Sequence, residues 1–424
     1  MRISFRKLDW FKSGTFSIYA SGNIVFQVSS LFSELYILNL VSVNGIGAWQ
    51  LALLLQSYVI LSRLGIINAF NREYPFLLGS KDQSKANLIL GTTHAHVKFS
   101  CFFQSIFFLL SSGYCYLILE NNLLAKLFIV MTVFTSLDAL VNLHEAKLRA
   151  NLNFSRLGKI KLASSLLPLI LLYFPYNFEF DGLLVRVILL QVFIYTLYKV
   201  FGAHSSRALF KQEIWLELFS FGWKIWLWSY IKNFNKGMPK LFLSIGGGLT
   251  SLGLFAPINW MLLSVSIISN NFSTFLYSNL SKLYGEGRDN LGIDSLLIAS
   301  LIFISCYPFV FFLYLNLDFF VDLLIPRYAN VLKEMGIALL ASPFEIFYMC
   351  TSNWASSKNW KMMYIFIALD FIIRLVFLAY FMLTSESLIY GVSMGIMFSS
   401  IFIAFTIILM ILIEHLISKN LKKN

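Results

Sequence analysis

The sequence has few charged residues, few prolines and few cysteines for its length. Only 13% of its 424 residues are charged, whereas a soluble domain usually carries about a quarter. Hydrophobic residues make up 58%, and 43 residues are phenylalanine. These proportions exclude an ordinary water-soluble fold and indicate a protein whose bulk lies in a lipid bilayer.

The few cysteines form no recognisable metal or disulfide motif. All four fall in apolar segments without metal-ligand spacing, so we expect packing roles for them. They are Cys101, Cys115, Cys306 and Cys350. A phosphate-binding loop of the G-x-x-x-x-G-K type is also missing, so an ATP-driven pump would need a separate subunit. We expect no cofactor, and a proton or sodium gradient as the energy source.

Apolar runs recur along the whole chain. A spanning helix needs about 20 mainly apolar residues, because each residue adds 1.5 Å towards a hydrocarbon core of roughly 30 Å. We therefore predict an all-α multi-pass membrane protein with about twelve spanning helices. The predicted segments are residues 15–40, 49–67, 99–119, 124–143, 157–174, 182–201, 215–234, 249–276, 296–315, 331–349, 362–383 and 388–413.

Lysine and arginine collect in alternate loops. They precede the first segment and follow the even-numbered ones, as in the loop with Arg72, Lys81 and Lys85, whereas the intervening loops are short and poor in bases. Basic loops stay in the cytoplasm, so we expect both termini there. The net charge of +12 then reflects topology and attraction to membrane lipids, and no nucleic-acid partner is expected.

Two parts of the chain resemble each other at an offset of 206 or 207 residues. GIGAWQLALLLQSYV from Gly45 aligns with SLGLFAPINWMLLSV from Ser251, and GSKD from Gly79 aligns with GEGRD from Gly285. Transporters often consist of repeated halves. We therefore predict an N-terminal lobe of residues 1–205 and a C-terminal lobe of residues 206–424, with six helices in each.

Several segments carry a resemblance to a known family. They are LVSVNGIGAWQLALLLQSYV, SRLGIINAFNREYPFLLGSKDQSKA, LGLFAPINW, YSNLSKLYGEGRDN and DLLIPRYANV. Their order resembles the polysaccharide flippases of the multidrug/oligosaccharidyl-lipid/polysaccharide exporter superfamily, above all the O-antigen or lipid-linked repeat-unit flippases. The resemblance implies two six-helix lobes around a central cationic cavity. One departure is Arg63, which stands where many relatives have an acid, so any ion-coupling role of that acid does not carry over.

The resemblance also implies a function. Such a protein is no enzyme; it flips polyprenyl-diphosphate-linked oligosaccharide repeat units from the cytoplasmic to the periplasmic leaflet by alternating access, coupled to an ion. The product serves O-antigen, capsule or exopolysaccharide synthesis at the bacterial cytoplasmic (inner) membrane. The implied partners are that lipid-linked oligosaccharide, membrane lipids, and the polymerase and chain-length proteins of the same pathway.

Two other classes of function stay open at this point. One is a membrane polymerase, ligase or glycosyltransferase of the same pathway, which would be expected to carry a sizeable external loop with active-site motifs. The longest external connection here has about a dozen residues. The other is an exporter of small molecules or cations, or a flippase for the peptidoglycan precursor, from a sibling branch. A cation exporter would be expected to have an acid-rich cavity, and this chain offers lysines.

Four lysines on the seventh segment are candidates for substrate binding. Lys224, Lys232, Lys236 and Lys240, here called the lysine stripe, are separated by multiples of four and so share one side of a helix. A charge inside the bilayer is costly, and a diphosphate would need such cations in a wet cavity. The alternative is that these lysines snorkel to the two membrane surfaces. Arg63 is the remaining candidate for the substrate site.

Charged residues within other segments are candidates for ion coupling. They are Glu34, Asp138, Glu345, Asp370 and Arg374. Glu34 is either a protonation site, a partner for the lysine stripe, or a neutral acid bonded to nearby serines. Asp370 and Arg374 are spaced i, i+4, which favours a structural pair. For Asp138 and Glu345 a proton or cation site is one option, and Pro343 frees a backbone carbonyl near Glu345.

Polar residues at two further places in the chain are expected to have structural roles. Arg186 lies five residues after Asp181, and the two are expected to pair at the outer interface. His94 and His96 precede the third segment, where a solvated loop is the favoured interpretation over a pH sensor.

Overall fold

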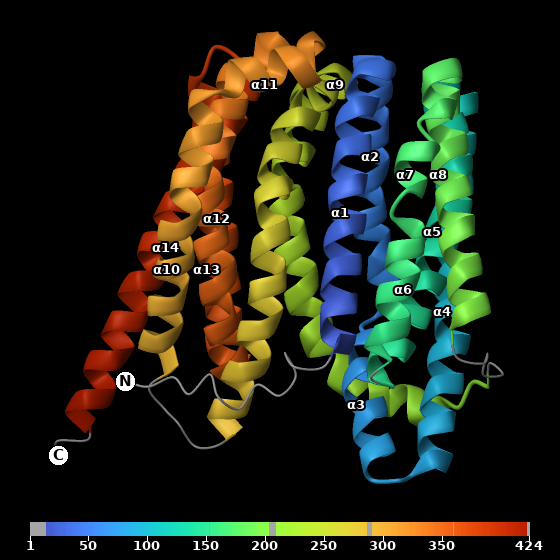
Figure 1. Ribbon diagram of the computed structural model, residues 1–424, viewed down its shortest axis with the longest axis vertical. Helices are drawn as coiled ribbons and strands as arrows, with labels where there is room; N and C mark the ends of the chain where they lie inside the picture. The colour runs from blue at the N-terminus through green and yellow to red at the C-terminus, as the bar shows by residue number, and fades with distance from the viewer. Residues whose placement is uncertain (1–13, 152, 203–208, 286–290, 359, 422–424) are drawn as a thin grey trace. The chain divides into compact units, whose positions relative to one another are not determined.

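The computed structural model describes residues 14–151, 153–202, 209–285, 291–358 and 360–421. Within these ranges the chain forms α-helices and two short 3-10 helices, and no strand (Figure 1). It divides into two compact units, Met1–Tyr230 and Ile231–Asn424, here called unit 1 and unit 2.

Nine helices among the described residues are long and apolar enough to cross a membrane. One of these, Gln212–Leu262, has 51 residues, far more than one crossing requires. Its backbone is non-helical at Gly248 (φ 65°, ψ −158°), directly before the predicted start of a new segment at residue 249. The predicted all-helical membrane architecture is confirmed, whereas the count of twelve and the two six-helix lobes around a cavity stay predictions.

Unit 1 is built from long and short helices. Its elements are α1 (Gly14–Leu40), α2 (Val43–Val59), η3 (Ile60–Arg63), α3 (Ile66–Gly79), α4 (Gln83–Leu117), α5 (Asn122–Ala150), α6 (Phe154–Ser164), α7 (Leu167–Ile170), α8 (Tyr173–Phe201) and the first part of α9 (Gln212–Gly285). Side-chain oxygens of Ser42, Asp82 and Asn121 cap α2, α4 and α5 by accepting from free backbone N–H groups of the first turn.

The second predicted segment, 49–67, is not one continuous helix. After η3 the backbone turns left-handed at Leu64 (φ 45°) and Gly65 (φ 72°), and α3 begins at Ile66. A Cβ on Gly65 would lie 2.5 Å from the carbonyl oxygen of Gly222, so two backbones meet closely here. α3 was not expected from the sequence, and α4 begins at Gln83, well before the predicted residue 99.

The fifth predicted segment, 157–174, is broken in the structure. Helix α6 ends at Ser164, and Pro168 stands at the start of the short α7, because proline lacks the N–H that a continuous helix would use. Two serines of α1 satisfy carbonyls of this break. Ser33 Oγ donates to Pro168 O at 2.6 Å, and Ser29 Oγ donates to Ser165 O.

The first turns of α9 pack within unit 1. Leu218 is buried in one core with residues of α3 and α4, among them Phe70, Tyr74 and Ile89. Lys85 Nζ also donates to Glu217 Oε1 at 2.7 Å. These contacts explain why the first turns of α9 belong to unit 1, which ends at Tyr230. The predicted lobes, residues 1–205 and 206–424, stay a prediction.

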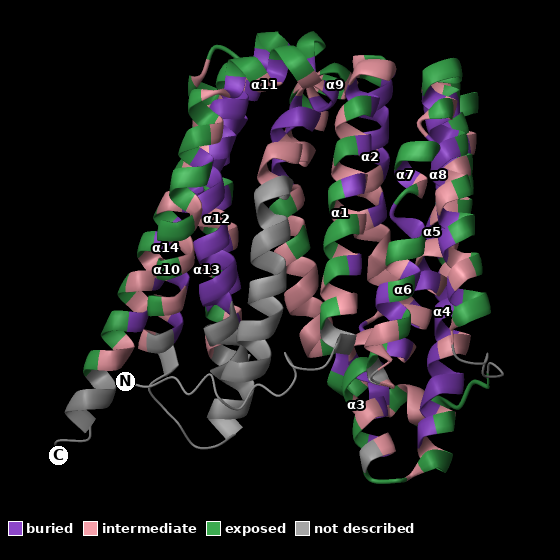
Figure 2. Ribbon diagram, in the orientation of Figure 1, coloured by how far each residue is buried: buried purple, intermediate pink, exposed green. Residues whose placement is uncertain are grey.

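Unit 2 contains the rest of α9 and the C-terminal helices. These are α10 (Leu291–Leu315), α11 (Leu317–Leu324), η4 (Pro326–Val331), α12 (Leu332–Lys358), α13 (Trp360–Thr384) and α14 (Leu388–Leu421). Helix α12 packs against α10, α13 and α14. It is accordingly the most buried of the candidate spans, as the purple ribbon in Figure 2 shows.

Candidate functional site

A buried ionic cluster in unit 2 joins three of the predicted site residues. Arg374 Nε donates to Asp370 Oδ1 at 2.7 Å, and Arg374 NH2 donates to Glu345 Oε1 at 2.8 Å. The side chains of Arg374 and Asp370 are only 6% and 2% exposed. The i, i+4 pair expected within α13 is therefore present, and the same guanidinium also holds the acid of α12.

Three further side chains of this cluster were not identified from the sequence. Tyr348 OH donates to Asp370 Oδ2 at 3.0 Å, Asn235 Nδ2 donates to the same oxygen at 2.6 Å, and Ser400 Oγ donates to Glu345 Oε1 at 2.5 Å. Only Tyr348 had a local signal, since it lies one helical turn after Glu345. Asn235 and Ser400 come from α9 and α14, so no spacing in the sequence connects them to the acids.

Two residues of the lysine stripe lie beside this cluster. Lys232 Nζ lies 5.9 Å from the ring centre of Tyr348, and Arg374 approaches the same ring to 5.8 Å. Both Lys232 and Lys236 lie within electrostatic range of Asp370 and Glu345. An aromatic face attracts cations, so Tyr348 contributes to holding two positive charges in place.

The other two residues of the lysine stripe lie elsewhere on α9. Lys240 follows in unit 2, two turns after Lys232, and its side chain is partly buried. Lys224 belongs to unit 1 and is also partly buried. All four residues of the lysine stripe therefore lie on α9, as their spacing predicted. Lys224 belongs to unit 1, whereas the other three belong to unit 2.

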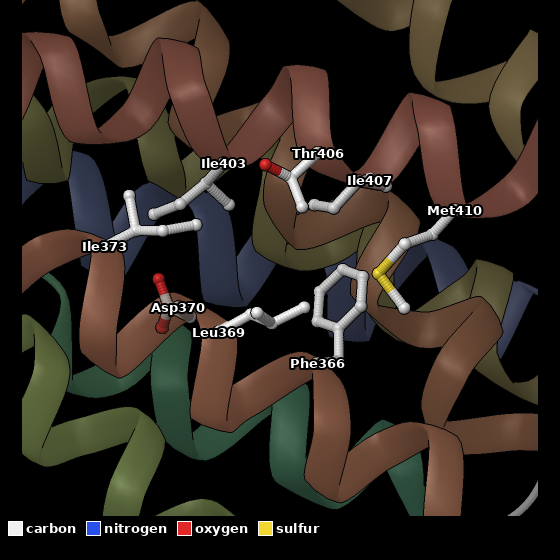
Figure 3. Close-up of a pocket in the computed structure, with 8 residues that line it drawn as sticks. All are labelled: Phe366, Leu369, Asp370, Ile373, Ile403, Thr406, Ile407 and Met410. Atoms are coloured by element: carbon white, nitrogen blue, oxygen red, sulfur yellow. The ribbon is translucent and has the colours of Figure 1, made fainter.

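A small pocket lies between α13 and α14 of unit 2 (Figure 3). Asp370 is the one charged residue among the described residues that line it, and its carboxylate lies near Ile373, whereas Phe366 and Met410 lie further along the pocket. The remaining lining is apolar apart from Thr406. Such a lining offers no set of polar groups for a sugar or a diphosphate, so the ionic cluster and its lysines form the better candidate site.

Unit 1 contains a second ionic pair between predicted site residues. Arg63 NH2 lies 2.9 Å from Asp138 Oδ2, which also accepts from Asn142 Nδ2 at 3.1 Å. Arg63 was expected to bind substrate, and Asp138 was expected to take part in ion coupling. The structure therefore pairs a candidate for substrate binding with a candidate for ion coupling. Arg63 Nε is buried and has no hydrogen-bond partner among the residues that the structure describes, which leaves this N–H as a further donor of the guanidinium.

His96 is buried beside this pair, and the expectation of a solvated loop was wrong. Its Nε2 lies 3.1 Å from the carbonyl oxygen of Arg63, and its Nδ1 accepts from Trp215 Nε1 at 3.1 Å. The reason is that α4 starts sixteen residues before the predicted segment, which places His96 inside a packed helix.

Glu34 pairs with an arginine of α8. Arg186 NH1 lies 3.1 Å from Glu34 Oε1, and Arg186 NH2 donates to Ser33 Oγ at 2.7 Å. Arg186 is 1% exposed, so the predicted interfacial pair with Asp181 was wrong. Asp181 instead pairs at the surface with Lys126, at 3.0 Å.

Each of the four acids predicted to take part in ion coupling therefore has an arginine partner. The guanidinium groups offset the cost of placing these carboxylates in a protein interior, which is otherwise high. Among the described residues, no group of three histidines, cysteines or acids is arranged to hold a metal ion. Chemically, the cations of unit 2 are suited to an anionic ligand, and the acids are suited to organising those cations.

The sequence matches one known protein family. A family model described as polysaccharide biosynthesis protein matches residues 75–328. No curated protein sequence matches the chain.

Solved structures are similar over nearly the whole chain. An inward-facing multidrug resistance MATE family transporter of the MOP superfamily is 13% identical, with a TM-score of 0.70, covering 93% of this chain and 97% of the other. An outward-facing one is 15% identical, with a TM-score of 0.67 and 94% of each chain covered. The lipid II flippase MurJ, in an inward closed conformation, is 13% identical, with a TM-score of 0.69 and coverage of 93% and 87%. At these identities the similarity establishes a common fold.

Proposed function

Because the chain belongs to the polysaccharide biosynthesis protein family, we propose that it flips polyprenyl-diphosphate-linked oligosaccharide repeat units from the cytoplasmic to the periplasmic leaflet. This membership confirms the family expected from the sequence. The fold, which a multidrug transporter and a lipid II flippase share, supports a transport role for this chain.

The position of Lys232 and Lys236 carries the proposal. Both lie in a helix that is long and apolar enough to cross the membrane, next to the cluster of Asp370, Arg374 and Glu345. With all five groups ionised, three positive charges face two negative ones, and the cluster keeps one positive charge in excess. A diphosphate brings compensating negative charge, and lysine suits it as a mobile point charge with three donors.

The transport cycle that we propose is alternating access of two lobes, 1–205 and 206–424, coupled to protons or sodium ions. Candidates for the coupling step are the acids Glu34, Asp138, Glu345 and Asp370, together with Arg374. Because each acid binds an arginine, a coupling cation would compete with that arginine for the carboxylate. Coupling would then involve release of an existing ion pair and not occupation of an empty site.

The proposed setting is the bacterial inner membrane, with both termini in the cytoplasm. The product would enter O-antigen, capsule or exopolysaccharide synthesis, where the polymerase and chain-length proteins of the pathway are the expected partners. The bias of lysine and arginine towards alternate loops supports this orientation.

Deletion of the gene in the source bacterium tests the function. We expect loss of surface glycan and accumulation of the lipid-linked repeat unit on the cytoplasmic leaflet, both restored by the wild-type chain. Leaflet location is measured by the access of a membrane-impermeant sugar-modifying reagent to sealed right-side-out and inverted vesicles. Accumulation of unpolymerised units on the outer leaflet would contradict flipping and favour a polymerase or glycosyltransferase.

A further inference from the structure

Helix α11 lies between the ends of two helices that are long and apolar enough to cross the membrane. The span within α10 ends at Leu315, and the next one begins at Pro326. Helix α11 itself has eight residues, or about 12 Å of rise, and is too short to cross. Figure 1 shows it lying across the ends of α10 and α12. The connectivity therefore places α11 at a boundary between hydrocarbon and water.

Six of the eight side chains of α11 form three faces, and the other two, Phe320 and Leu324, are partly buried. Leu317 and Val321 are buried against the protein, at 5% and 0% exposure. Phe319 and Leu323 form an apolar stripe and are 64% and 65% exposed. An acidic stripe of two exposed aspartates, Asp318 and Asp322, lies between these faces.

The order of the three faces around the axis of α11 is the one expected of a helix that lies on a membrane surface. Each residue of an α-helix advances by about 100°, so the acidic stripe lies roughly 100° from the apolar stripe and also roughly 100° from the buried face. A helix that rests against its own protein at a bilayer boundary has that arrangement when one flank faces lipid and the other faces water.

We propose that α11 is an interfacial helix that inserts Phe319 and Leu323 into the lipid surface and holds Asp318 and Asp322 in the aqueous layer. Its partner is the bilayer itself, at the border of headgroups and acyl chains. In the orientation proposed above this is the periplasmic leaflet. The inference does not depend on the transported substrate, because it rests on connectivity, length and the three faces alone.

Four single-cysteine variants test the proposal: Phe319→Cys, Leu323→Cys, Asp318→Cys and Asp322→Cys. Each is made in a chain whose four native cysteines are replaced, labelled with an environment-sensitive fluorophore and reconstituted in phosphatidylcholine nanodiscs. Spin-labelled lipids and aqueous iodide then serve as separate quenchers. We expect lipid quenching at 319 and 323 about twofold stronger than at 318 and 322, and the reverse order for iodide.

The aspartate positions serve as matched controls one residue away on the same helix. Equal iodide access at all four positions would contradict the proposal, since it would leave the apolar stripe open to water and to a partner protein. If the cysteine-free chain does not fold, a fluorescent amino acid introduced by codon suppression at the same four positions of the native chain gives the same comparison.

Discussion

Asp138 in α5 and Glu345 in α12 lie 207 residues apart, and each carboxylate binds an arginine of another helical element. The separation equals one of the two offsets at which the halves of the sequence resemble each other. The partners differ, since Arg63 belongs to η3 and Arg374 to α13. We infer that both acids serve to hold an arginine of another helical element, and their separation is the one expected if the predicted duplication is real.

The bridging role of Arg374 predicts a large loss of stability when it is removed. Arg374→Met leaves Asp370 and Glu345 buried without their cation, and breaking a buried pair costs on the order of 3 kcal/mol or more. We expect a clear fall in the apparent melting temperature of the purified protein in detergent. Adding Glu345→Gln to Arg374→Met should recover part of the loss, because one orphaned charge is removed.

Lys126→Met provides the matched control for Arg374. Lys126 and Asp181 form an ion pair whose side chains are 59% and 61% exposed, and such pairs contribute about 1 kcal/mol or less. Its melting temperature should stay close to that of the wild type. Equal losses for Lys126→Met and Arg374→Met would contradict the structural role given to the buried cluster.

The close approach of Gly65 and Gly222 predicts that neither tolerates a methyl group. Gly65 has a φ of 72°, and a Cβ on either glycine would lie 2.5 Å from the carbonyl oxygen of the other. Gly65→Ala should lower stability by roughly 2–4 kcal/mol through left-handed strain and overpacking. Gly222→Ala should lower it by roughly 1–3 kcal/mol through overpacking alone.

Gly113 is the control for these two substitutions. It lies within α4, and a Cβ there would come within 4 Å of no described atom beyond the adjoining backbone of its own helix. Gly113→Ala should therefore be neutral or stabilise the helix by about 0.5–1 kcal/mol. The measurement is the melting temperature of the three variants in the same detergent. Equal melting temperatures would contradict the close approach of Gly65 and Gly222.

Tyr348 allows the hydroxyl and the ring to be tested separately. Tyr348→Phe removes the donor to Asp370, a loss of about 1.5–3 kcal/mol for a bond to a charged group, but keeps the face that Lys232 and Arg374 approach. Tyr348→Leu removes both. We expect Tyr348→Phe to retain more glycan export than Tyr348→Leu when the two are compared at equal membrane abundance. Equal export would show that the ring does not help to hold the cations.

The sequence predicted features that depend on neighbours along the chain. Apolar run length placed the helix boundary at residue 249 next to the break at Gly248, and i, i+4 spacing identified the pair of Asp370 and Arg374. Helix α3 was missed because its apolar residues occupy one face only and never form a run long enough to cross a membrane.

The partners of the intramembrane charges could not be predicted in the same way. Arg186 and Glu34 are 152 residues apart, so no local pattern favours them over Arg186 and Asp181, which are five residues apart. Likewise, His96 accepts a hydrogen bond from Trp215 because the start of α9 packs against α4. Such pairs depend on which helices lie side by side, a property that hydrophobic periodicity does not determine.

The lysine stripe yields the prediction that bears most directly on transport. Lys232→Ala and Lys224→Ala should each abolish surface glycan while membrane abundance stays normal, because a diphosphate then loses a cation in a medium where charges are poorly solvated. Lys232→Arg should keep part of the export, because the positive charge remains although a planar guanidinium replaces the compact ammonium.

Lys126→Ala, which removes an exposed lysine paired at the surface, is the control and should export normally. Glycan is measured on whole cells against immunoblots of the membrane fraction, and normal glycan at normal abundance in both Lys232→Ala and Lys224→Ala would exclude the stripe as the substrate site.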